Sequence, residues 1–241
     1  MSLRNLLRPQ NVFDYTRSLV ETGECKLALD IGCGNSSPLS ALRPKITTIG
    51  LDGYAPAIEI AKKKGLHDHY IVADILKEDP EKILERSQLP GKCDIVSLYG
   101  VIEHLPKRMG YELLERCEKL TSKYVILETP HGFVDQGPEF GNEFQRHLSG
   151  WFIPDFQGLG YKVYGVTGTR YLRGYMAGPK YSWPGCILLD EILTLLLRIN
   201  ARPRHAFNLV AIKDIRGVPA RYGPEKQSMV ERNAGANRPS L

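Results

Sequence analysis

The residues best suited to chemistry in this chain are a carboxylate and a pair of glycines at the end of an apolar run. Asp30 lies in the run Leu27–Ile31, and the turn Gly32–Gly34 follows directly. Glycines after a buried strand let the backbone approach a ligand closely, because they have no Cβ. A carboxylate at this turn suits a cationic ligand better than a pyrophosphate. A nicotinamide dinucleotide would also require a third glycine at position 37, where the chain has Ser37.

Two further strand-like runs are followed by carboxylates. Ile46–Leu51 is rich in β-branched residues and precedes Asp52, and His69–Ala73 precedes Asp74. Nucleoside-binding α/β folds place the acceptor for ribose hydroxyls at the position that Asp52 occupies. The alternative for both aspartates is a role in capping a turn.

Imidazole side chains follow the later apolar runs. Glu103 and His104 are adjacent, shortly after the run Cys93–Leu98, and His131 and His147 lie further along the chain. An imidazole near its usual pKa is a good general base toward a hydroxyl group. We rank His147 first because its loop should overhang an acceptor. A packing role is equally open for each histidine.

Taken together, these residues resemble the class I S-adenosylmethionine-dependent methyltransferases. The segment from Asp30 to Gly34 is similar to motif I of that family, and Tyr99–Pro106 is similar to the segment after strand 4 in the branch that methylates small molecules. The resemblance implies a Rossmann-like α/β three-layer sandwich, with S-adenosyl-L-methionine as cofactor. Its mixed seven-stranded sheet would have the order 3-2-1-4-5-7-6, with strand 7 antiparallel. The cofactor-binding residues predicted from the motifs and the resemblance are Asp30, Gly32, Cys33, Gly34, Asp52, Gly53, Asp74, Ile75 and Tyr99.

The reaction expected from this resemblance is O-methylation of a small-molecule, glycan or lipid-linked hydroxyl. The candidate general bases are His147, His131 and His104, and no metal is expected because the chain shows no clear metal-ligand spacing. An RNA methyltransferase is the alternative enzyme. A catalytically inactive methyltransferase-like binding subunit is the alternative outside enzymes, and the intact motif argues against it.

The distribution of charge bears on the choice of partner. The net charge of the 241 residues is +5, of which +3 lies from Arg216 onward and +2 in residues 1–8. Residues 9–215 are therefore neutral, which argues against a nucleic-acid partner. Five scattered cysteines and the lack of a secretory leader predict reduced thiols and a cytoplasmic location.

Length and patterning predict one domain over residues 1–215, with a helical insertion at about 170–204 and a disordered basic tail over 216–241. Further predicted helices are Pro9–Glu21, a short helix from Pro38, Ala55–Lys64, Pro80–Ser87 and Gly110–Leu120, and further predicted strands are Lys123–Glu128, Tyr161–Thr167 and His205–Lys213.

The insertion contains Cys186–Asn200, which is strongly apolar with a helical period. At 1.5 Å per residue this segment is too short to cross a bilayer. So much leucine must nevertheless be covered by something. The alternatives are the sheet edge or a twin subunit in a homodimer, and an apolar acceptor or a peripheral membrane contact.

Overall fold

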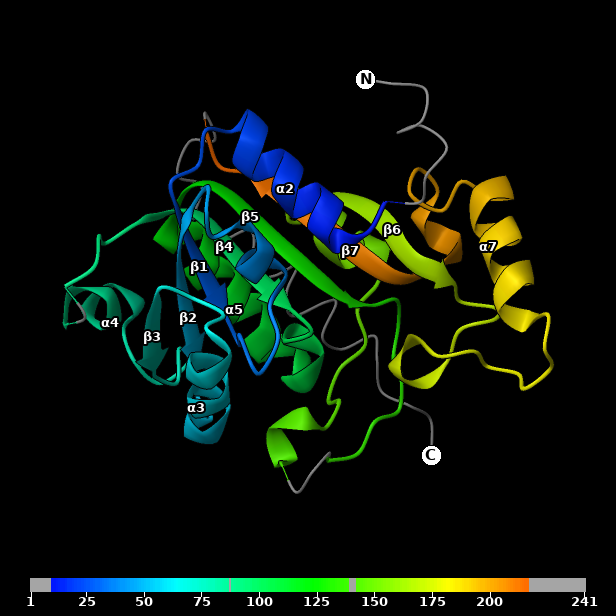
Figure 1. Ribbon diagram of the computed structural model, residues 1–241, viewed down its shortest axis with the longest axis horizontal. Coiled ribbons are helices and arrows are strands. Elements are labelled where there is room, and N and C mark those ends of the chain that lie inside the picture. Colours follow the sequence, from blue (N-terminus) through cyan, green and yellow to red (C-terminus); the bar gives the residue numbers. More distant parts are fainter. Residues whose placement is uncertain (1–9, 87, 139–141, 217–241) are drawn as a thin grey trace.

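The computed structural model describes residues 10–86, 88–138 and 142–216, and these residues form one central sheet (Figure 1). The strand order is β3-β2-β1-β4-β5-β7-β6. The neighbours from β3 to β5 pair in parallel, whereas β7 is antiparallel to both β5 and β6. The predicted fold class and strand order are confirmed.

The elements lie close to the predicted ranges, with ends that shift by a few residues. The strands are β1 (Leu27–Ile31), β2 (Thr47–Asp52), β3 (His69–Val72), β4 (Cys93–Tyr99), β5 (Thr121–Pro130), β6 (Lys162–Thr169) and β7 (Ala206–Asp214). The α-helices are α2 (Val12–Thr22), α3 (Ala55–Lys64), α4 (Pro80–Arg86), α5 (Lys107–Leu120), α6 (Ile153–Gln157) and α7 (Cys186–Leu196).

One predicted element differs in kind. The segment after the glycine turn forms a single 3₁₀ turn, η1 (Pro38–Leu42), instead of an α-helix. Ser37 caps it by accepting a hydrogen bond from the Leu39 amide at 3.2 Å. A ligand over the glycine turn therefore meets loop amides, without the dipole of a long helix.

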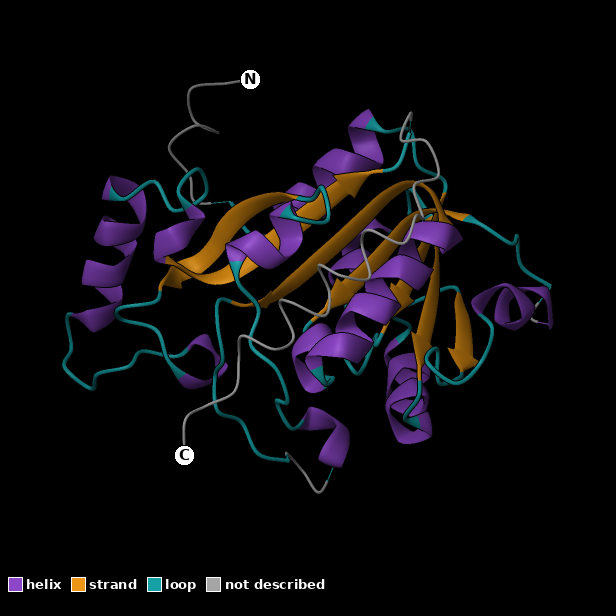
Figure 2. Ribbon diagram, turned by 180° about the vertical axis from the view of Figure 1, so that it is seen from behind, coloured by secondary structure: helices purple, strands orange, loops and turns teal. Residues whose placement is uncertain are grey.

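The sheet separates two apolar cores because alternate side chains of a strand point to opposite faces. In β5, Val125 and Leu127 belong to the larger core, which also takes in side chains of α4, α5 and α6. Tyr124 and Ile126 belong to the smaller core, which α2 and η1 cover. Helices thus lie on both faces of the sheet, as Figures 1 and 2 show. The carboxyl ends of the parallel strands stay open for a site.

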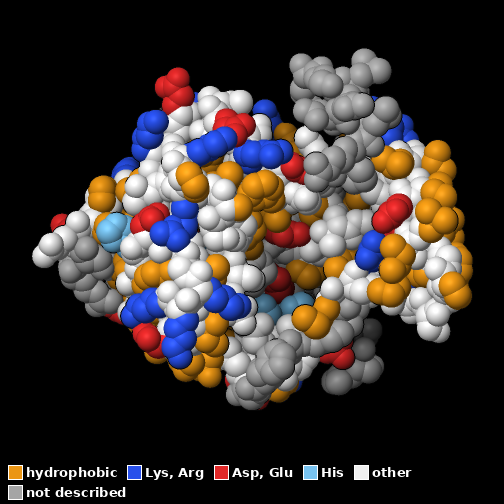
Figure 3. All heavy atoms as spheres, in the orientation of Figure 1, with side chains coloured by type: hydrophobic (Ala, Val, Ile, Leu, Met, Phe, Trp, Pro, Cys, Tyr) orange, Lys and Arg blue, Asp and Glu red, His pale blue; other side chains and the backbone are white. Residues whose placement is uncertain are grey.

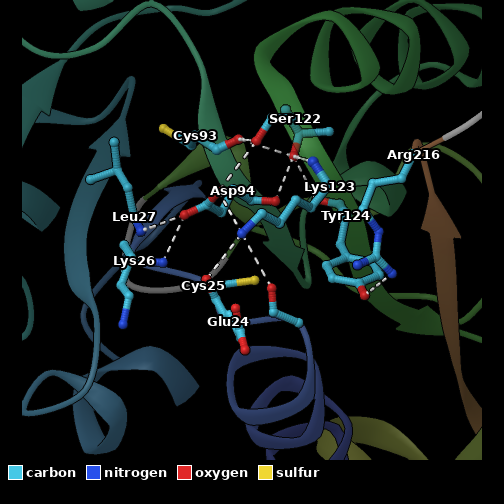
Figure 4. A network of polar contacts seen from close by, with 12 residues as sticks. Glu24, Cys25, Lys26, Leu27, Cys93, Asp94, Ser122, Lys123, Tyr124 and Arg216 are labelled. Carbon is cyan, nitrogen blue, oxygen red and sulfur yellow. Dashed lines mark hydrogen bonds and ion pairs between the residues drawn. The ribbon is translucent and has the colours of Figure 1, made fainter.

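Polar contacts close the opposite edge of the sheet, where β1, β4 and β5 begin (Figure 4). Asp94 Oδ2 accepts hydrogen bonds from the amides of Lys26 at 2.7 Å and Leu27 at 3.2 Å. Its other oxygen lies 3.2 Å from Lys123 Nζ. Lys123 also donates to the carbonyls of Gly23 and Glu24 at the end of α2. Asp94 therefore connects the beginnings of β1, β4 and β5, and its partner Lys123 connects them to the end of α2.

Two predictions concern the chain's ends and the membrane. The predicted tail lies outside the described residues apart from Arg216. Within the described ranges, none of the helices combines the length and apolar character that a bilayer crossing requires.

Replacing Asp94 by alanine should lower the free energy of unfolding by about 1–3 kcal/mol, because two amides and an ammonium group lose their partner. Urea unfolding of the variant measures this change. Glu59→Ala, which removes an exposed carboxylate on α3, is the matched control and should change stability little. A variant as stable as the parent would show that water replaces Asp94 at this edge.

The same network predicts a loss of stability in acid. Burial opposes ionisation of Asp94, but the two amides and Lys123 outweigh it and hold the pKa of this carboxyl below its usual value. The contribution of Asp94 is therefore complete above the unfolded-state pKa of about 3.9 and disappears as pH falls through the lower folded-state pKa. The difference in stability between parent and Asp94→Ala should shrink over that range.

Candidate functional site

The glycine turn after β1 has a backbone that only glycine adopts easily. Gly32 and Gly34 have φ values of +68° and +53°, in the left-handed region. A Cβ on Gly32 would also lie 2.6 Å from a methyl group of Val101. In contrast, a Cβ on Gly34 would meet nothing nearer than 3.9 Å, so the backbone there faces open space. The turn can therefore approach a ligand on one side while it packs tightly on the other.

Asp30 lies beneath this turn instead of at its open face. Its side chain is almost completely buried, and its two oxygens accept hydrogen bonds from Ser37 Oγ at 2.5 Å and Ser97 Oγ at 2.8 Å. Burial raises the pKa of Asp30 to about 7, although both serines oppose the shift. Ser37 occupies the position of the third glycine of a dinucleotide motif, and its hydroxyl group fixes the Asp30 side chain by a hydrogen bond. The Asp30 carboxylate thus holds the loop after β1 in position from the buried side of the turn.

His67, which the sequence analysis did not single out, adjoins this carboxylate. Its Nε2 lies 3.6 Å from Asp30 Oδ2, and both side chains are buried. Burial lowers the pKa of His67 to about 4, so the ring is neutral. Its position before β3 carries no recognisable motif, and only the fold brings it to Asp30.

Asp52 ends β2 and faces the same turn. Its Oδ2 accepts from the Gly34 amide at 2.9 Å, and its Oδ1 accepts from the Tyr54 amide at 2.8 Å. Each carboxylate oxygen retains a further lone pair, which can accept a hydroxyl proton. A Cβ on the adjacent Gly53 would meet nothing nearer than 3.7 Å. Asp52 therefore combines an acceptor for ribose hydroxyls with an open backbone beside it.

The other predicted cofactor residues are Asp74, Tyr99, Cys33 and Ile75, and their side chains make contacts within the protein. Asp74 follows β3 and does cap its turn, accepting from the Leu76 amide at 3.0 Å and pairing with Lys77 at 2.9 Å. Tyr99 ends β4, and its hydroxyl lies 2.8 Å from Thr16 Oγ1 on α2. The side chains of Cys33 and Ile75 are buried in the protein. Cys33, which is part of the glycine turn, can therefore contact a ligand only through its backbone. The adenine contacts predicted for Asp74 and Ile75 stay predictions.

A cavity of about 540 Å³ lies beside the glycine turn, over the ends of β4 and β5. Its lining includes Ser36, Tyr99, Glu103, His104, His147 and Asn208. Figure 3 shows a hollow in the middle of this face with acidic and histidine side chains inside it. The cavity thus joins the turn to two of the three histidines predicted as bases.

His104 and His147 meet edge to face, with ring centroids 4.8 Å apart. Glu103 lies beside them: it and the two imidazoles each offer one ligand atom, and these atoms lie within 4.8 Å of one another. Burial raises the pKa of Glu103 to about 7, although Thr129 Oγ1 donates to it at 2.9 Å. The three groups could serve as a proton acceptor or hold a cation.

Main-chain contacts fix the His147 loop against the segment after β4. The amides of Leu148 and Ser149 both donate to the Glu103 carbonyl, at 2.8 and 3.1 Å. Trp151, completely buried, donates from its indole nitrogen to the Ile102 carbonyl at 3.2 Å. The indole ring fills the space beside Gly110, where a Cβ would lie 2.3 Å from it. This packing holds the two histidines together.

His131 does not join this pair, because it is not among the residues that line the cavity. Its ring packs edge to face on Phe152, and its Nδ1 lies 3.3 Å from the Ala206 carbonyl. Two cavity residues that the sequence analysis missed are Glu128 and Asn208, joined by a 3.0 Å hydrogen bond across β5 and β7. Neither lies in a motif, and their pairing depends on the antiparallel register.

Replacing Asp52 by alanine should weaken binding of S-adenosylhomocysteine by about 1–3 kcal/mol, because hydroxyl donors and the Gly34 amide lose their acceptor. Calorimetry on the purified chain measures this, with Glu59→Ala as the control that should bind normally. NAD should not bind either protein. An unchanged dissociation constant would remove Asp52 from the site.

Comparisons with known proteins agree with this geometry. The family model described as a methyltransferase domain matches residues 29–123, from β1 through the start of β5. No curated protein sequence matches the chain significantly.

Among solved structures, a SAM-dependent methyltransferase from Archaeoglobus fulgidus is 19% identical, with 85% of this chain and 95% of that chain covered and a TM-score of 0.48. The plantazolicin methyltransferase in complex with SAH is 19% identical, with coverages of 87% and 82% and a TM-score of 0.49. The magnesium protoporphyrin IX methyltransferase from Synechocystis PCC 6803 with bound SAM is 17% identical, with coverages of 87% and 88% and a TM-score of 0.48.

Four observations indicate what type of enzyme this chain is. They are the family match, the strand order, the glycine turn and the Asp52 carboxylate beside that turn. The open backbone at Gly34 and Gly53 and the free acceptor capacity of Asp52 fit the nucleoside of S-adenosylmethionine. Residues 29–123 therefore match a methyltransferase domain, and the chain has the strand order and the glycine turn expected of an enzyme that uses S-adenosylmethionine.

Proposed function

We propose that this enzyme methylates a hydroxyl oxygen of a small-molecule, glycan or lipid-linked acceptor. The observation that carries the proposal is the imidazole pair of His104 and His147 in the cavity beside the glycine turn. A hydroxyl group must lose its proton when its oxygen is methylated, and a neutral imidazole can take that proton. Bound S-adenosylmethionine supplies an activated methyl group on its sulfonium, so the protein has to supply orientation and this base.

Hydrogen bonds set the tautomer of both rings. His147 Nδ1 lies 2.7 Å from the Val134 carbonyl, and His104 Nδ1 lies 3.2 Å from the Arg146 carbonyl. A carbonyl oxygen only accepts, so each Nδ1 carries the proton and each Nε2 carries the lone pair.

The two rings differ in their suitability as base. Burial, followed by the charge of a protonated His147, lowers the pKa of His104 to about 4. Such an imidazole stays neutral at physiological pH and holds a proton poorly, whereas a general base works best with a pKa near the working pH. We assign proton removal to His147, whose side chain lines the cavity, with His104 as the neutral ring that packs against it.

Amide and carboxyl groups on the far wall can orient the acceptor. Asn208 Nδ2 donates to Glu128 Oε1 at 3.0 Å, whereas Asn208 Oδ1 is buried and has no hydrogen-bond partner in the described part of the chain. A buried acceptor without a donor costs free energy, so a ligand hydroxyl there would be bound favourably.

Replacing His147 by glutamine should lower kcat by about 10²–10⁴-fold and leave cofactor binding unchanged. The assay uses methyl-labelled S-adenosylmethionine with a panel of sugar, phenol and lipid-linked hydroxyl acceptors. Each is matched with its amine analogue, because methylation of the amines alone would contradict the proposal. His131→Gln is the matched control and should keep its activity, since His131 lies outside the cavity lining.

The same residues allow a second way to activate a hydroxyl. Glu103, His104 and His147 could hold a divalent cation, and imidazoles that bind metals commonly donate their other nitrogen to a carbonyl, as both rings do here. Our proposal uses His147 as the base and needs no metal. Activity should then persist after dialysis against EDTA. Loss of activity that magnesium or zinc restores would instead assign the three side chains to a metal site.

A further inference from the structure

Helix α7 is attached to the protein by its polar side. Cys186, Asp190 and Thr194, spaced four residues apart, are its buried residues. The apolar side chains face outward, with exposed fractions of 62% for Leu188 and 71% for Leu196. The other exposed aliphatic side chains of α7 are Ile187, Leu189, Ile192 and Leu195. A helix packed on a soluble domain normally has the opposite arrangement, with its apolar stripe inside.

Specific bonds hold α7 in this orientation. Asp190 Oδ1 accepts from the amide and hydroxyl of Thr169 at 2.8 and 2.7 Å, and Asp190 Oδ2 accepts from Arg173 Nε at 2.6 Å. Beyond the helix, Asn200 Nδ2 donates to the Gly165 carbonyl at 2.8 Å. Turning the leucines inward would require these hydrogen bonds to break. The outward face is thus built into the fold.

The exposed apolar surface continues beyond α7 into the loop that precedes it. Met176, Tyr181 and Trp183 in that loop are exposed by 70%, 49% and 47%. In Figure 3 apolar side chains gather at the edge of the molecule where Figure 1 places α7, with basic side chains nearby. Contiguous exposed apolar patches of this kind mark interaction surfaces, and Tyr and Trp suit a boundary between apolar and aqueous surroundings.

Charge distinguishes this segment from the rest of the protein. Residues 170–204 hold six basic and two acidic side chains, a net charge of +4. Residues 9–215 as a whole are neutral, so the remainder of that span carries −4. Arg198, Arg202 and Arg204 are exposed just after the apolar helix. Basic side chains beside an outward apolar helix are the features of a segment that lies on an anionic membrane.

We propose that the outward face of α7 seats the protein on an anionic lipid surface. The leucines enter the boundary between head groups and acyl chains, and the three arginines meet lipid phosphates. The rest of residues 9–215 carries a net charge of −4 and is repelled by the same surface, which favours this orientation. A helix of this length lies in the membrane plane, because it is too short to cross.

A second copy of the chain fits the same face less well. A twofold dimer through α7 would bring residues 170–204 of the two copies together, and each of these segments carries a net charge of +4. Such like charges repel, whereas anionic head groups complement them. Charge complementarity therefore favours the membrane over a twin subunit.

The membrane contact also bears on the acceptor, in a step that rests on the proposed O-methylation. Met176 and Ala177, from the loop before α7, line the cavity that holds His104 and His147. An acceptor whose apolar tail stays in the membrane could present its hydroxyl head at this cavity. The structure thus favours the lipid-linked class among the proposed acceptors.

Flotation with vesicles tests the membrane contact without any methyl transfer. The full chain should float with vesicles of phosphatidylcholine and phosphatidylglycerol, and much less with phosphatidylcholine alone. Leu188→Gln with Leu196→Gln should weaken vesicle binding about a hundredfold, since each leucine contributes about a tenfold factor when buried. Ile60→Gln, which replaces an exposed isoleucine on α3 at the other end of the molecule, should float like the parent.

Cofactor binding by calorimetry shows that each variant is folded, because neither leucine belongs to the site. Failure of the parent to float with anionic vesicles would overturn the proposal, as would flotation that the double variant retains. A parent dimer in ultracentrifugation that the double variant dissociates, together with no flotation, would assign the face to a second copy. A chain that floats but methylates only amines would overturn the O-methylation and leave the membrane contact intact.

Discussion

A buried carboxylate under a glycine turn is the constraint on which the rest of the site depends. Asp30 is out of contact with water, and a buried charge is tolerated only where hydrogen bonds satisfy it. Ser37 and Ser97 provide those bonds from the loop after β1 and from β4. They join the two strands at the switch point of the sheet, where α/β proteins bind their ligands. The position of the turn, and of Asp52 beside it, follows from this pairing.

The site has two halves, a predicted cofactor half and a proposed acceptor half, and they lie on either side of β4 in the sheet. Residues before β4 provide the backbone turn and the strand-end carboxylates that are predicted to bind the cofactor, and these features need only local sequence and parallel strands. Residues after β4 form the acceptor cavity from loops, β5 and β7. Loops vary more freely than strands. The family match, which ends at residue 123, covers the first half and stops before His147 and Asn208. Of the cavity residues, Glu103 and His104 lie within the matched span, whereas His147 and Asn208 lie beyond it.

The hydrogen bonds of one buried side chain, Asp190, determine which face of α7 is exposed. Asp190 binds Thr169 and Arg173, and this contact turns the leucines of α7 toward the outside. The insertion that contains α7 also supplies Met176 and Ala177 to the cavity wall. Residues 170–204 thus supply both the exposed apolar face of α7 and part of the cavity wall.

The amino-acid sequence determined the fold class, and the strand order through its family resemblance, and it predicted the residues of a cofactor site. Those features depend on short-range patterns: apolar runs, glycines that need positive φ, and carboxylates that end strands. Only the tertiary structure decided that His147 lies against His104, 43 residues away in the chain, while His131 lies apart from them. It also placed Asp30 beneath the turn and the leucines of α7 outside. Each of these depends on contacts between distant segments, which hydrophobic periodicity does not encode.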